Sequence, residues 1–196
     1  MAPMEAAFGV LAGILQLAAI APYLRDILGG STTPQRATWM IWTTLSLVVL
    51  ASQWASGATW SLALTAGQAL SCGTVLALSI RRGAGGVSPL ELALLGLAGL
   101  GVVGWRIAGD PTVATCSVVA ADLVAVALML PKTYRQPATE TLATYAIGVV
   151  STLFALVAIG SSAASLWIYP LYILAADSAV VAVIVLRRRA LAAVAA

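Results

Sequence analysis

Histidine and asparagine are both absent from this chain of 196 residues, and charged residues make up only 9% of it. Soluble globular domains carry about 25% charged residues, so the composition excludes that class. Without histidine the chain lacks the commonest proton relay and metal ligand. Both cysteines lie inside apolar runs, where a small core residue is the expected role. We therefore expect no metal site and no other cofactor.

Motifs for catalysis are also missing. The chain has no metal-ligand spacing, no nucleophile motif and no ATP-binding motif, so we do not expect an enzyme. Its ten basic residues are scattered at the ends of apolar runs and do not form a patch, which argues against nucleic acid as a partner.

Apolar runs fill most of the length. Hydrophobic residues make up 61% of the chain and form seven runs of about the 20 residues that an α-helix needs to cross a bilayer. We expect an all-α membrane protein with seven transmembrane helices in contact with the lipid bilayer. The expected spans are Ala6–Ile27, Thr38–Ser56, Trp60–Ile80, Leu90–Ala108, Thr112–Leu130, Leu142–Gly160 and Leu166–Leu186.

The basic residues predict the orientation of these spans. If alternate loops lie on one side, nine of the ten basic residues gather there and only Arg106 lies opposite. Because positive charge marks the cytoplasmic side, we expect the N-terminus outside and the C-terminus in the cytoplasm, in a bacterial plasma membrane. The nine residues are Arg25, Arg36, Arg81, Arg82, Lys132, Arg135, Arg187, Arg188 and Arg189.

Two halves of the chain resemble each other. Pro22 and Pro131 each come late in an apolar run, 109 residues apart, and a basic loop follows each. After the loop the offset is 106 residues, and it holds from Trp39 and Tyr145 to Arg81-Arg82 and Arg187-Arg188. One register across two turns and two helices indicates an internal duplication.

A duplication of three helices requires one extra crossing if both copies share an orientation. The fourth span suits this role, because its middle carries glycines (Gly96, Gly99, Gly101 and Gly104) and no polar side chain. We therefore predict two parallel three-helix repeats joined by a linker helix. Residues 1–82 form the first bundle, 83–110 the linker loop and fourth helix, 111–189 the second bundle and 190–196 a cytoplasmic tail.

These features resemble the PQ-loop superfamily, in particular SWEET-like proteins built from two bundles of the SemiSWEET kind. The resemblance covers nearly the whole chain. It depends on Pro22 and Pro131, on the turns Ser31-Thr32-Thr33 and Thr139-Glu140-Thr141, and on the aromatic residue that opens the following helix. The family's Pro-Gln pair is here Pro22-Tyr23 and Pro131-Lys132. At the third-helix positions where the family often has a pocket asparagine, this chain has Ser71 and Asp177.

Two acidic residues are expected at the middle of the membrane. Asp122 and Asp177 each lie nine or ten residues from the ends of their runs, which is about 14 Å at 1.5 Å per residue. An ionisable group at this depth costs about 2.5–3.5 kcal/mol and is a functional candidate. We predict that both couple transport to protons, and that Asp177 also binds solute. The alternative is a structural hydrogen bond between helices.

Neutral polar residues are expected at the same depth. We predict that Gln16, Gln68 and Ser71 bind solute in a cavity between the two bundles, together with Trp42 and Tyr169. We assign Trp39 to the interfacial aromatic belt.

The two equivalent prolines have two interpretations. Pro22 and Pro131 either end their helices or act as paired hinges that open the inner side of the cavity, and we favour hinges.

A transporter is the function that these features favour. We expect a secondary transporter that moves a small polar solute, sugar-like or another metabolite, by alternating access. Proton coupling and facilitative sugar transport without an ion both remain open. A non-transporting seven-helix receptor of the same fold is the alternative from another class, and an oligomer is compatible with either.

Overall fold

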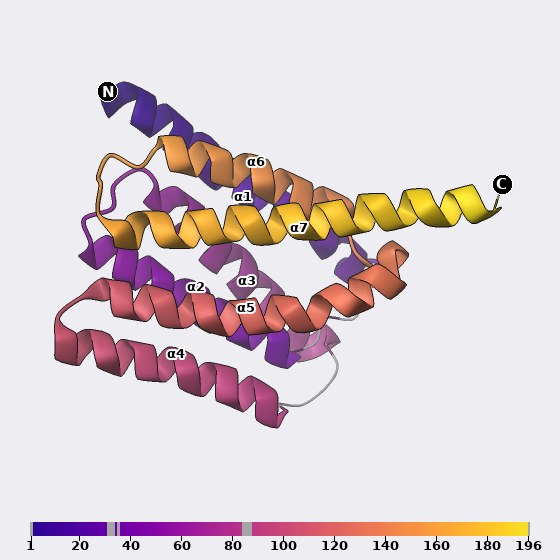
Figure 1. Cartoon of the computed structure of the whole chain (residues 1–196), viewed down its shortest axis with the longest axis horizontal. Coiled ribbons are helices and arrows are strands. Elements are labelled where there is room, and N and C mark those ends of the chain that lie inside the picture. The colour runs from indigo at the N-terminus through magenta and orange to yellow at the C-terminus, as the bar shows by residue number, and fades with distance from the viewer. Residues whose placement is uncertain (1, 31–33, 35, 84–87, 196) are drawn as a thin grey trace.

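Seven α-helices and one short 3-10 helix form the chain (Figure 1). The computed structural model describes residues 2–30, 34, 36–83 and 88–195. The elements are α1 (Ala2–Leu28), α2 (Arg36–Ala55), α3 (Leu62–Arg82), α4 (Pro89–Ala108), α5 (Pro111–Arg135), η1 (Pro137–Thr139), α6 (Leu142–Val157) and α7 (Ala164–Ala195). All seven predicted helices are present. The predicted turn at Ser31-Thr32-Thr33 lies outside the described residues, as do the side chains of Lys132 and Thr139.

Five of the helices are long and apolar enough to cross a membrane, by length and composition: α1, α3, α4, α5 and α7. The other two fall short for different reasons. Helix α2 has 20 residues, but threonine, serine, glutamine and Arg36 lower its hydropathy. Helix α6 is apolar but has only 16 residues, about 24 Å of helix. The helical architecture is compatible with an integral membrane protein.

We call α1–α3 the first group of helices and α5–α7 the last group. In the first group α3 packs against both α1 and α2, and in the last group α7 packs against both α5 and α6. Between the groups α1 packs against α6, and α2 packs against α5. Within the described residues, the backbones of α1 and α2 do not come close, and neither do those of α5 and α6. These pairs meet only through side chains, such as Tyr23 with Trp39 and Met129 with Tyr145.

Helix α4 lies at the edge of the bundle, against α5 and α2 (Figure 1). Its start is fixed by a capping box: the Ser88 hydroxyl accepts a hydrogen bond from the Glu91 N–H, and the Glu91 carboxylate accepts one from the Ser88 N–H. At its end, Gly109 adopts a φ of 70°, which a residue with a Cβ rarely does. The turn then leads directly into α5.

Two of the four glycines of α4 lie against α5. Gly101 and Gly104 face side chains of α5, whereas a Cβ on Gly96 or Gly99 would meet nothing within 4 Å. Another close approach involves Gly9 on α1, which lies against the backbone of Trp60, two residues before α3. Small residues thus bring α4 close to α5, and α1 close to the segment that leads into α3.

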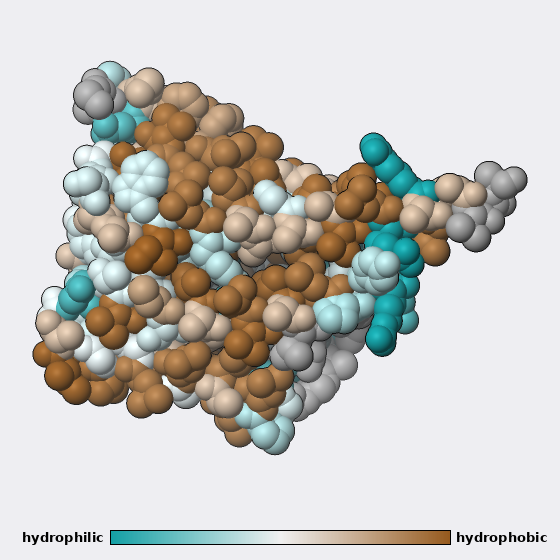
Figure 2. Space-filling model, viewed as in Figure 1, coloured by the Kyte–Doolittle hydropathy of each residue, from teal (hydrophilic) through white to brown (hydrophobic). Residues whose placement is uncertain are grey.

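Charged residues gather at one end of the bundle, from which the long helix α7 projects (Figures 1 and 2). We call this the basic end; it carries Arg36, Arg82, Arg135, Arg187 and Arg188. With 32 residues α7 is about 48 Å long, more than the ~30 Å hydrocarbon core requires. The expected tail at 190–196 is helical through Ala195.

Proline does not end either of the two equivalent helices. Helix α1 continues past Pro22 to Leu28, and α5 continues past Pro131 to Arg135. A proline inside a helix removes one backbone hydrogen bond and crowds the preceding turn. The last turns of α5 bend away from the rest of the helix (Figure 1). The interpretation of these prolines as helix ends is therefore wrong.

Candidate functional site

A cavity of about 140 Å³ lies between the two groups of three helices. All six of these helices line it, and α4 does not. The lining residues come from the middle of each helix and from its half nearer the basic end, such as Trp39 on α2 and Met129 on α5. The volume is below the roughly 300–1,000 Å³ of pockets for drug-sized ligands, so the cavity suits a small solute.

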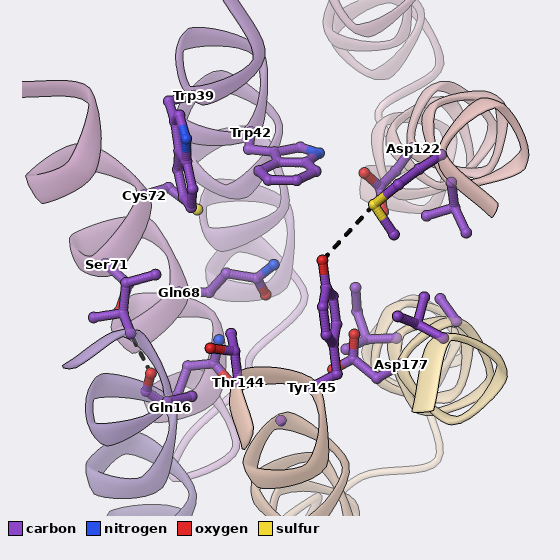
Figure 3. A pocket seen from close by; sticks show the side chains of 18 residues that line it. Gln16, Trp39, Trp42, Gln68, Ser71, Cys72, Asp122, Thr144, Tyr145 and Asp177 are labelled. Atoms are coloured by element: carbon purple, nitrogen blue, oxygen red, sulfur yellow. Dashed lines mark hydrogen bonds between the residues drawn. The ribbon is translucent and has the colours of Figure 1, made fainter. Parts of the chain in front are cut away.

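Two carboxylates form one wall of this cavity. Asp122 on α5 and Asp177 on α7 both line it (Figure 3). The hydroxyl of Tyr172 donates a hydrogen bond of 2.8 Å to Asp122 Oδ2, and the Trp42 indole lies beside the same carboxylate. Asp177 lies against Gly148 of α6, where a Cβ would collide with its Oδ2.

Amide and hydroxyl groups form the opposite wall (Figure 3). Gln16 on α1 and Gln68 and Ser71 on α3 line the cavity there. Ser71 Oγ is 3.5 Å from the backbone oxygen of Gln16, at the limit of a hydrogen bond. Tyr169 does not line the cavity, but its hydroxyl donates to Gln68 Oε1 at 3.0 Å and so joins α7 to α3. The sequence-predicted binding residues other than Tyr169 thus surround one space.

Trp39 is buried and lines this cavity. Its side chain is only 8% exposed, it lines the cavity, and it packs between Tyr23 and Trp42 with ring centroids 5.1 Å from each. The assignment of Trp39 to the aromatic belt was wrong, because its position near a helix end did not reveal which way the ring points.

Among the lining residues that were not predicted, Thr144, Tyr145 and Gly148 come from α6. Gly148 lies at the position of Trp42 in the 106-residue offset, so it could have been found by carrying that predicted residue across. Tyr145 lies at the position of Trp39, which was assigned to the aromatic belt, so the offset gave no signal for it.

The half of the bundle away from the basic end is closed by direct contacts between the two groups. Ser151 Oγ on α6 donates to the backbone oxygen of Ala12 on α1 at 2.7 Å. Ser52 Oγ on α2 lies 2.8 Å from Thr115 Oγ1 on α5, and all four of these residues are buried. We call these two hydrogen bonds the seal. They belong to a packed layer of helix contacts, and the cavity lies on the side of this layer that is nearer the basic end.

No protein-family model, curated protein or solved structure matches the chain.

Proposed function

We propose that the chain is a secondary membrane transporter that moves a small polar solute by alternating access. The observation that carries this proposal is the cavity between the two helix groups, with Asp122, Asp177, Gln16 and Gln68 around it and the seal on one side. Polar groups at the middle of apolar helices are costly unless they meet water, solute or each other. A cavity that collects them on one side of a layer of direct helix contacts has the form of a transport site in one of its two states.

The two groups act as parallel repeats in this proposal, with α4 as the linker. Among these six helices, exchanging α1 with α5, α2 with α6 and α3 with α7 turns each contact into another observed contact, whereas the contacts of α4 have no counterpart among the described residues. Arginines at equivalent positions support the same relation. Arg82 donates to the backbone oxygen of Leu28, the last residue of α1, and Arg188 donates to that of Pro137, just after the end of α5.

The basic end faces the cytoplasm in this proposal, and the seal is the closed outer gate. Positive residues at helix ends favour the cytoplasmic side. The cavity is therefore in an inward-directed state, and the N-terminus lies outside. Pro22 and Pro131 lie in the half of α1 and of α5 that would move when the inner side closes, which supports their role as hinges.

The two carboxylates, Asp122 and Asp177, support proton-coupled transport in this proposal. Two acids in one low-dielectric cavity disfavour the state in which both are charged. One proton can then travel with the solute. A facilitative carrier without ion coupling uses the same cavity and is the second candidate.

Counterflow in proteoliposomes tests the transport proposal. Purified protein is first screened by thermal shift against sugars, amino acids, amines and vitamins, and the best ligand is loaded into the vesicles. Labelled ligand added outside should then accumulate transiently. If, for every ligand that binds, the labelled ligand accumulates no more than in protein-free vesicles, the non-transporting receptor would be favoured.

A further inference from the structure

The charged groups that line the cavity all have one sign. Of the described lining residues, Asp122 and Asp177 are the acids, and none is lysine or arginine. At the basic end, Arg36 donates to the backbone oxygen of Ser79 at 2.9 Å, and Arg188 donates to that of Glu140 at 2.9 Å. An anionic solute would therefore find no cation in this space.

Asp177 retains free acceptor capacity. Among the residues that the structure describes, none donates a hydrogen bond to its carboxylate, whereas Asp122 is held by Tyr172. Gly148 allows this carboxylate to lie against α6 and to border the cavity. A half-buried carboxylate without a donor from the described residues favours a partner that supplies one.

A hydroxyl on the lining also lacks a partner. Thr144 Oγ1 is buried, and no described group hydrogen-bonds to it. Thr144 lines the same cavity, on α6 beside Tyr145 (Figure 3). An orphaned polar atom facing a cavity indicates that water or a ligand completes it.

Aromatic rings complete the lining. Trp39, Trp42 and Tyr145 contribute to the cavity, and Trp42 lies beside Asp122 (Figure 3). Ring faces attract cations and the methylene groups next to them, and tryptophan does so best. Carboxylates and ring faces in one cavity both select positive charge.

From these observations we infer that the solute is a small organic cation with a primary ammonium group, bound between Asp177 and Asp122 beside Trp42. A primary ammonium group carries three donors, which suits free carboxylate oxygens better than a quaternary nitrogen does. The opposite wall, with Gln16, Gln68 and Ser71, takes an uncharged hydroxyl or carbonyl group of the same molecule. This inference depends on the proposed function and narrows its polar solute to a chemical class.

Matched ligand sets test the inference on the full chain in detergent. One set is 2-aminoethanol, 1,2-ethanediol and glycolate, and the other is glucosamine, glucose and glucuronate, all at neutral pH and equal ionic strength. Within each set the shape is similar and the charge changes. Because a ligand that binds the folded state raises the melting temperature, the amine of at least one set should raise it most and the anion should leave it unchanged.

Two variants test whether the amine binds at Asp177. Asp177→Asn should weaken binding of the stabilising amine by about 10- to 100-fold, the loss expected for a charged hydrogen bond. Asp110→Asn is the matched control, because Asp110 is exposed in the α4–α5 turn and asparagine caps helices equally well. Monodisperse elution and an unchanged ligand-free melting temperature show that each variant is folded.

The outcomes separate the inference from the transport proposal. If the neutral member of each set stabilises as well as its amine, or if no member binds, the cation inference is wrong. An amine that binds through Asp177 without counterflow supports the inference and contradicts transport. Counterflow of a neutral sugar that the amines do not inhibit contradicts the inference and leaves transport intact.

Discussion

The hydroxyl of Tyr172 donates a hydrogen bond of 2.8 Å to Asp122 Oδ2 and thereby joins α7 to α5 across the wall of the cavity. Tyr172→Phe removes this donor and keeps the ring. Without the bond the Asp122 carboxylate can turn, so we expect counterflow to fall by about tenfold, the equivalent of one charged hydrogen bond. Tyr134→Phe, an exposed tyrosine near the basic end, is the control. Full activity of Tyr172→Phe would show that the bond does not position Asp122 for transport.

The carboxylates themselves should matter more. Asp122→Asn and Asp177→Asn keep the shape of the side chain but remove the charge, and each should reduce counterflow by more than tenfold, since a charged partner contributes about 1.5–3 kcal/mol. Ser71→Ala should have a smaller effect, because the hydrogen bond that the Ser71 hydroxyl makes to the backbone oxygen of Gln16 is 3.5 Å long and therefore weak. Initial rates at equal amounts of folded protein provide the measurement. Wild-type rates in both asparagine variants would assign the two acids to structure.

Gly148 offers a test that leaves every polar group in place. A Cβ at this position collides with Asp177 Oδ2, so Gly148→Ala should displace the carboxylate and lower transport by about tenfold. Alanine favours helix by about 1 kcal/mol over glycine, so the variant should still fold. Gly96→Ala is the matched control, because the space beside Gly96 is open. Equal activity of the two variants would show that the position of Asp177 against α6 is unimportant.

The proposed orientation predicts which loops are accessible from each side. In a background with Cys72 and Cys116 replaced by alanine, Thr59→Cys and Ser162→Cys should react with an impermeant thiol reagent in intact cells. Ala138→Cys and Arg81→Cys should react only after lysis, because they lie at the basic end. All four positions are exposed. One position labelled from the other side would contradict the arrangement of spans.

A pH gradient tests proton coupling. With acid outside, wild-type proteoliposomes should accumulate solute above its external concentration, whereas Asp177→Asn should retain at most exchange. Two carboxyl groups can hold one proton and one ammonium group at the same time, so a cationic solute is compatible with this coupling. The control is an ionophore that collapses the gradient. Wild-type uptake that is the same with and without the gradient would indicate a facilitative carrier.

Depth along a helix could be predicted from the sequence, but rotation about the helix axis could not. Counting residues from the ends of apolar runs placed Asp122 and Asp177 at mid-helix, and both line the cavity. Which tyrosine of α7 contacts the acids depends on how the helix is rotated about its axis. Tyr169 was expected in the site but reaches only Gln68, and Tyr172, which was not expected there, contacts Asp122.

The ends of a helix could be predicted where residues next to the end favour starting or stopping a helix. Ser88-Pro89 and Gly109 bound α4 within one residue of the expected span. The prolines were less informative, because a helix surrounded by other helices can continue past a proline when its neighbours hold it, as α5 does to Arg135. The orientation of Trp39 required the neighbouring rings of Tyr23 and Trp42, which come together only in the fold.

The two halves of the chain contribute different walls of the cavity: the first half contributes amide and hydroxyl groups, and the second half contributes the two carboxyl groups. A hypothetical dimer of the first half alone would surround its cavity with Gln16, Gln68 and Ser71 twice and hold no acid. A dimer of the second half would bring four carboxyl groups together, and their repulsion would keep most of them protonated. In the proposal that the halves are repeats, only the pairing of two unlike halves gives a cavity with two carboxyl groups. Either half paired with a copy of itself would lose the charge or hold twice as many acids.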